Sequence, residues 1–197
     1  ISRNTVRKSI NKLVYEDLII RKKGIGTQVI KKSIETNLSD WSSFSEEMHS
    51  LGIDFQNYSI KTYWTKADEK ISLFFNINKK DSVYTLERLR GDKDGPFVFF
   101  ISYFHPQIKF KKDEDFSRPL YELLEKDHHQ IVNRSLEKIK ARLPELDIAK
   151  KLKISQSHPI LIRERRVYNS GDKPIELNIG YYRSDKFTYQ IDIKRKQ

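Results

Sequence analysis

The chain has 197 residues, of which 37% are hydrophobic and 12% aromatic, enough apolar mass for a folded core rather than wholesale disorder. It contains no cysteine, which excludes disulfide bonds, thiol catalysis and cysteine-ligated metal and favours a reducing, cytoplasmic location. The net charge of +11 favours a polyanionic partner, and no apolar run approaches the roughly 20 residues that span a bilayer, so no membrane partner is expected.

Positive charge is concentrated at the start of the chain. Residues 1–32 carry nine lysines and arginines against two acidic residues, a net charge of +7, so the rest of the chain carries +4. A local field of this kind suits DNA. A solvated, lysine-rich surface is the alternative interpretation, and charge alone does not choose between them.

The first predicted element is an amphipathic helix that ends near Leu18, with Ser2 as its N-cap. Its polar sides carry Arg3, Thr5 and Arg7. Arginine can bond guanine through two hydrogen bonds, and hydroxyl groups can hold phosphates. A helix that buries one stripe and offers these groups at its start is typical of a major-groove reader. The apolar stripe, at helical period, consists of Val6, Ile10, Leu13 and Val14.

Two short strands, 19–23 and 27–30, follow this helix, and Gly24 and Gly26 lie in the turn between them. Glycine tolerates positive φ and lets the backbone approach a surface closely. A basic hairpin directly after a basic helix predicts the wing of a winged helix-turn-helix.

The segment ISRNTVRKSINKLVYEDLIIRKKGIGTQV resembles the second half of the winged helix-turn-helix of the GntR family of bacterial regulators, with its Ser-Arg-x-Thr-Val-Arg helix and Gly-x-Gly-Thr wing. Family members carry two more helices upstream, whereas this sequence begins at Ile1 without a methionine. We therefore expect the chain as given to bind operator DNA poorly. The resemblance implies DNA contacts from Ser2, Arg3, Thr5 and Arg7 of the helix and from Gly26 and Thr27 of the wing.

Residues 31–37 are predicted to form a short linker, because they show no hydrophobic period. Ser39 or Asp40 is then expected to cap a helix. A strand over 58–64 and a short helix over 68–75 follow. The helix after the linker carries Trp41, Phe44, Met48 and Leu51 on one face.

Two later stretches share one layout, in which a strand ends in arginine-rich sequence and a Gly/Asp/Lys/Pro turn leads to a second strand. This faint repeat predicts two hairpins in one sheet. Residues 131–142 are ambiguous, and we favour a strand because alternate residues from Ser135 to Ala141 can share a face. The fold class is therefore α+β, a mostly antiparallel sheet with helices on one side. The predicted strands are 83–90 and 97–103 in the first hairpin and 160–168 and 175–183 in the second. The helices span 119–125 and 144–152, and the last strand 187–193.

This region resembles the UTRA ligand-sensing domain of the HutC subfamily of GntR regulators, which shares its fold with chorismate lyase. The matching phrases are LERLRGDKDGPFVFFISYFHP, PLYELLEKDHHQIVNRSLEKIKA and PILIRERRVYNSGDKPIELNIGYYRSDKFTYQI. The resemblance implies a partial winged helix-turn-helix over 1–32 and an effector-binding and dimerisation domain over 33–197. It further implies a homodimeric repressor that a small anionic effector, such as a sugar phosphate, releases from operator DNA.

Arg88 and Arg90 lie two apart on one predicted strand, so both side chains point to the same face. Two guanidinium groups on one face repel each other unless something anionic lies between them. A phosphate, a carboxylate or an acidic side chain can play that part. From the residues alone, the alternative interpretation is that the two arginines form structural ion pairs with Glu or Asp on a neighbouring strand.

The resemblance assigns this pair to the effector, because an Arg-x-Arg at this place holds the anionic group in sugar-phosphate-responsive members. It also implies effector contacts from Ser135, from the carboxylate of Glu176 and from the hydroxyl of Tyr182, although Tyr182 fits a core tyrosine equally well. Many members have a glutamate where this chain has Phe100 or its neighbour Phe99. That departure removes a hydroxyl acceptor, so the expectation is a small anionic ligand rather than a sugar phosphate specifically.

No metal site, cofactor or catalytic residue is predicted, because His128 and His129 are adjacent and no nucleotide loop or paired catalytic acids occur. The alternative function is a chorismate-lyase-like enzyme acting on a carboxylate substrate, which the DNA-binding segment disfavours. A protein that binds RNA through a basic sheet with aromatics is a weaker alternative, because Tyr58, Tyr63 and Trp64 alternate as core residues would and the sequence has no RNP-type motif.

Overall fold

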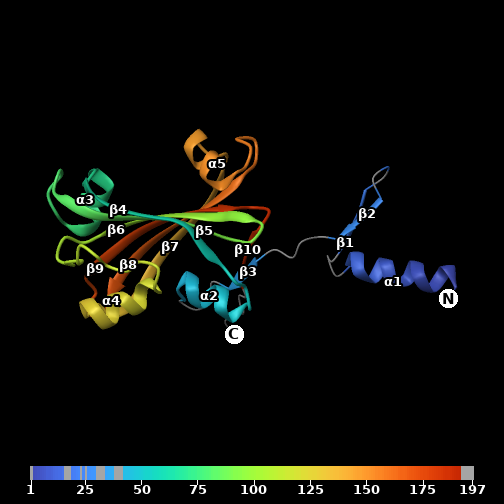
Figure 1. Cartoon of the computed structure of the whole chain (residues 1–197), viewed down its shortest axis with the longest axis horizontal. Coiled ribbons are helices and arrows are strands. Elements are labelled where there is room, and N and C mark those ends of the chain that lie inside the picture. The colour runs from blue at the N-terminus through green and yellow to red at the C-terminus, as the bar shows by residue number, and fades with distance from the viewer. Residues whose placement is uncertain are drawn as a thin grey trace, which may run out of the picture.

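A six-stranded antiparallel sheet forms the centre of the computed structural model (Figure 1). The structure describes residues 2–15, 19–22, 24, 26–29, 34–37 and 42–191. The strand order is β4-β5-β6-β9-β8-β7, so the two predicted hairpins, β5–β6 and β8–β9, meet at the middle of the sheet. The strands are β4 (Gln56–Lys66), β5 (Ser82–Asp92), β6 (Gly95–Phe104), β7 (Val132–Arg142), β8 (Ile160–Asn169) and β9 (Pro174–Arg183).

The predicted α+β class is confirmed, and the ambiguous stretch is the edge strand β7. The prediction that helices cover one side is wrong, because α2 (Phe44–Ser50) and α4 (Leu120–His128) lie on one face, and α3 (Glu69–Phe75) and α5 (Leu146–Leu152) lie on the other (Figure 1). The central strands are apolar on both faces: Phe104 packs in the cluster under α4, whereas Phe99 packs against α5. Burying two apolar faces requires a helical layer on each.

The linker prediction is also partly wrong, since Ile34–Asn37 forms strand β3. It pairs in parallel with β10 (Phe187–Gln190) at the other end of the chain. Ile34 is buried in a cluster with Phe187 and with Phe44 of α2. This short strand therefore ties the connection between the two predicted domains to the core of the second one.

Helix α2 begins later than its sequence predicts. Its N-cap is Ser43, whose hydroxyl accepts from the backbone nitrogen of Glu46 at 3.1 Å while the Glu46 carboxylate accepts from the Ser43 nitrogen at 2.7 Å. Such a reciprocal capping box fixes the start of a helix. The predicted caps Ser39 and Asp40 lie outside the described residues, as does Trp41.

The N-terminal unit consists of helix α1 (Arg3–Tyr15) and the antiparallel pair β1 (Ile19–Lys22) and β2 (Gly26–Val29), and it stands apart from the large sheet in Figure 1. Ser2 caps α1, because its hydroxyl accepts from the Thr5 nitrogen at 3.2 Å. The described residues cover the apolar stripe of α1 only in part: Val6 is 46% and Leu13 38% exposed, whereas Ile10 and Val14 are half-buried. No helix in the described ranges is long and apolar enough to cross a membrane.

Candidate effector-binding site

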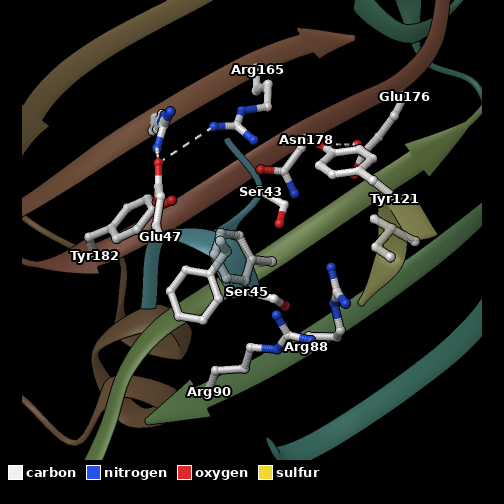
Figure 2. A pocket seen from close by; sticks show the side chains of 14 residues that line it. Ser43, Ser45, Glu47, Arg88, Arg90, Tyr121, Arg165, Glu176, Asn178 and Tyr182 are labelled. Carbon is white, nitrogen blue, oxygen red and sulfur yellow. Dashed lines mark hydrogen bonds and ion pairs between the residues drawn. The ribbon is translucent and has the colours of Figure 1, made fainter. Parts of the chain in front are cut away.

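A small cavity lies between the sheet and the two helices α2 and α4 (Figure 2). Arg88 and Arg90 of β5 line it together with Glu176 and Tyr182 of β9, so the structure brings four of the five predicted effector residues together. Its volume is about 30 Å³, room for about two or three water molecules. In this conformation the site is nearly closed.

Arg88 is the least satisfied charge in the cavity. Its side chain is only 5% exposed, and its Nε and Nη1 atoms have no hydrogen-bond partner among the described residues. Burial lowers the pKa of Arg88, and the nearby carboxylate of Glu176 opposes this shift only in part. A guanidinium remains charged in proteins, so the direction of the shift reports a cation that the protein alone solvates poorly. An oxyanion would supply the missing hydrogen bonds.

Arg90 is held by contacts that leave its charge uncompensated. Its Nε donates to Asn57 Oδ1 at 2.8 Å, and its guanidinium carbon lies 5.3 Å and 5.1 Å from the ring centroids of Phe44 and Phe55. Burial, reinforced by the like charge of Arg88, lowers the pKa of Arg90 to about 8. Within the described part of the chain neither arginine forms an ion pair, so no acidic side chain separates the two cations.

The second hairpin carries the same Arg-x-Arg pattern, but the charges of its two arginines are neutralised. Arg163 and Arg165 of β8 also point to this face, but two carboxylates neutralise them, the buried Glu47 and the half-buried Glu137. Arg163 Nη1 lies 3.1 Å from Glu47 Oε1, and Arg165 Nε lies 2.8 Å from Glu137 Oε1, while Arg163 also pairs with Glu137. Burial alone would raise the pKa of Glu137, but Arg165 and Arg163 outweigh it and lower that pKa. Only the first arginine pair is therefore available to a ligand.

Tyr121, in the first turn of α4, is a cavity residue that the sequence reasoning missed. Its hydroxyl donates to Glu176 Oε2 at 2.7 Å, and burial followed by the charge of Glu176 raises its pKa. Glu176 is itself almost fully buried. The sequence does place Tyr121 directly after Leu120, the first apolar residue of a predicted helix. However, the position of one tyrosine beside an apolar stripe does not show whether its hydroxyl points into a cavity or to solvent.

Loss of the Tyr121 hydroxyl is expected to be costly for its size. The free energy of unfolding of a Tyr121→Phe variant should be about 1–3 kcal/mol lower than that of the unaltered protein, because the buried Glu176 carboxylate loses a donor. Chemical denaturation by urea measures this difference. Tyr84→Phe is a suitable control, since Tyr84 is an aromatic packed against Phe110 and Phe116 on the same face of the sheet. An unchanged free energy of unfolding in Tyr121→Phe would contradict the assigned hydrogen bond.

Ser135 does not line the cavity. It lies on edge strand β7 and donates to Glu137 Oε1 at 3.0 Å, so it supports the neutralised arginine pair. The serines that line the cavity are Ser43 and Ser45, at the start of α2. Sequence periodicity could not distinguish these candidates, because they lie on elements far apart in the chain.

Aromatic side chains form the wall at the Tyr182 end of the cavity. Phe100 lies 5.1 Å from Phe44 and 5.6 Å from Tyr182 between ring centroids. Gly180 faces them from β9, and a Cβ atom there would come within 2.6 Å of the Tyr182 ring and 3.0 Å of the Phe100 ring. Tyr182 is thus both a packed core tyrosine and a cavity residue, and the two interpretations are compatible.

The predicted DNA contacts lie on the N-terminal unit. Ser2, Arg3, Thr5 and Arg7 are exposed at the start of α1, and Gly26 and Thr27 are exposed on β2. Gly24 and Gly26 have φ angles of 82° and 103°, which suit glycine in a tight hairpin. The described residues contain no group of three or more side chains that could hold a metal ion.

Fold and site define a ligand-sensing domain, and a family model described as the UTRA domain matches residues 50–188. The chain belongs to this family. It is similar to the transcriptional repressor NagR of Bacillus subtilis, 26% identical over 96% of this chain and 78% of NagR, and to the repressor MngR of Escherichia coli, 22% identical over 100% and 82%.

The protein is accordingly a HutC-type regulator of the GntR family, a ligand-responsive transcriptional regulator rather than an enzyme. Its structure resembles that of PhnF from Mycobacterium smegmatis, with a TM-score of 0.81 at 21% identity, over 100% of this chain and 87% of that one.

Proposed function

We propose that this regulator is a repressor whose operator affinity falls when a small anionic effector, such as a sugar phosphate, binds between Arg88 and Arg90. The observation that carries this proposal is the buried Arg88, with two nitrogen atoms that lack a partner among the described residues. Relatives named as repressors support the direction of the response. The same proposal includes a domain boundary after residue 32, between the DNA-binding and effector-binding domains, and a cytoplasmic location for the protein.

The effector-bound conformation differs from this one, because a cavity of about 30 Å³ does not admit a sugar phosphate. Helix α2 is the element best placed to move, since Ser43, Ser45 and Glu47 face the cavity from one side. It also packs with strand β3, which leads to the DNA-binding unit. An effector that prefers the opened state would weaken operator binding by its differential affinity, usually about 1–3 kcal/mol.

The experiment combines two measurements on the intact regulator. A thermal-shift screen of sugar phosphates, amino acids and organic acids first finds compounds that raise the melting temperature. Electrophoretic mobility shift with operator DNA then measures affinity with and without each compound. We expect at least one anionic compound to lower operator affinity about 5- to 150-fold. If binding compounds leave operator affinity unchanged, the proposed sensing function is wrong.

The N-terminal unit is expected to contact operator DNA through Ser2, Arg3, Thr5, Arg7, Gly26 and Thr27. An Arg7→Ala variant should weaken operator binding about tenfold, because it removes a charge-assisted contact to a base or phosphate. The matched control is Arg118→Ala, which removes a half-buried arginine of the sensing domain that pairs with Asp127. Equal losses in both variants would argue against contact by α1.

The active form is proposed to be a homodimer, because two recognition helices can read half-sites about one helical turn apart. Edge strand β4 supports self-association, since it is 11 residues long and exposes Tyr63 and Trp64, and long exposed edges of this kind are usually covered. Light scattering during size-exclusion chromatography should give twice the mass of one chain. A single-chain mass at micromolar concentration would contradict this part of the proposal.

A further inference from the structure

A second, wider cleft adjoins the arginine cavity. It has a volume of about 800 Å³ and is bounded by α2, by residues 52–55 that follow it, and by the start of α4. Ser43, Ser45 and Tyr121 line both the cavity and the cleft. The two spaces therefore lie on either side of one wall, and a ligand anchored at Arg88 that passes this wall enters the cleft.

The charged side chains that line the cleft are mainly acidic, whereas arginines predominate among the charged side chains of the cavity. Glu46, Asp54 and Glu122 line it, whereas no lysine or arginine does, although the whole chain has a net charge of +11. His49 is the sole basic side chain among its lining residues. Two spaces of opposite charge behind one shared wall are suited to a ligand with opposite charges at its two ends.

The three carboxylates differ in how free they are. Glu46 accepts from the Ser43 nitrogen in the capping box of α2. Glu122 pairs with Lys126 at 2.8 Å, but both side chains are largely exposed, and an exposed pair of this kind contributes less than about 1 kcal/mol. Asp54 makes no hydrogen bond or ion pair with any residue that the structure describes. Asp54 and Glu122 are thus the groups that a ligand can use.

We propose that the effector is a bifunctional molecule whose oxyanion binds at Arg88 and Arg90 and whose far end carries an ammonium group bound by Asp54 and Glu122. This inference rests on the proposed function, because Arg88 must hold the anionic end. The closed cavity has room for little more than a head group, so the body of the effector lies along Ser43, Ser45 and Tyr121.

Calorimetry on the full chain tests this with three phosphate esters that share a six-carbon chain: 6-aminohexyl, 6-hydroxyhexyl and hexyl phosphate, with inorganic phosphate as the head group alone. We expect the amino ester to bind about fivefold more tightly than the hydroxy ester, as two partly exposed ion pairs would give. The double variant Asp54→Asn/Glu122→Gln should remove this preference and leave inorganic phosphate binding unchanged. Glu125→Gln, a change at an exposed acid of α4 outside the cleft, is the matched control.

The outcomes separate the two proposals. If the three esters bind equally well, or if the double variant retains the preference, the ammonium site is wrong and the anion site stands. If neither the esters nor inorganic phosphate bind at all, the proposed function itself fails. If an Arg88→Met variant still binds the amino ester as tightly as the unaltered protein, the oxyanion does not lie where both proposals place it.

Discussion

Replacing Arg88 with methionine is expected to abolish effector binding and at the same time to raise the thermal stability of the free protein. The side chain is buried, two of its nitrogen atoms have no partner among the described residues, and burial lowers its pKa. A buried charge without full compensation destabilises the folded state, and an apolar side chain of similar length removes that cost. We expect a gain of about 1–2 kcal/mol in the free energy of unfolding.

Differential scanning fluorimetry with and without phosphate compounds measures both effects. A gain of this size should raise the melting temperature by about 2–8 °C, while the ligand-induced shift seen in the unaltered protein should vanish. A variant that melts lower than the unaltered protein would show that Arg88 is satisfied by contacts within the protein. A retained ligand shift would show that the anion binds elsewhere.

Arg163→Met is the matched change in the second hairpin and should have the opposite effect on stability. Arg163 contacts both Glu47 of α2 and Glu137 of β7, so its loss leaves a buried and a half-buried carboxylate with Arg165 as their shared cation. Removing one partner of a buried ionic network costs about 3–5 kcal/mol. The melting temperature should fall by about 10 °C.

Urea denaturation under the same conditions measures the free energy of unfolding of Arg88→Met and Arg163→Met. The same substitution, at the first arginine of the same Arg-x-Arg pattern, is expected to stabilise one hairpin and destabilise the other. Equal losses at Arg88 and Arg163 would mean that both pairs are structural. A stable Arg163→Met protein would mean that the carboxylates of Glu47 and Glu137 find other donors.

Most elements of the sensing domain could be predicted from local patterns. Alternating side chains and Gly/Asp turns placed the four central strands to within one or two residues, because strand period and turn chemistry are properties of neighbouring residues. The misplaced features depend on distant contacts. Strand β3 forms because β10 pairs with it from the far end of the chain, and the helices divide between two faces because both faces of β6 are buried.

The arginine pairs mark the limit of sequence reasoning in this protein. The sequence by itself determined that Arg88 and Arg90 share a face, and it determines the same for Arg163 and Arg165, because side chains two apart on a strand always do. Tertiary structure alone decided which pair remains open to a ligand. The carboxylates that neutralise Arg163 lie 116 residues away on α2 and 26 residues away on β7, and no local periodicity records which distant side chain will meet a buried charge.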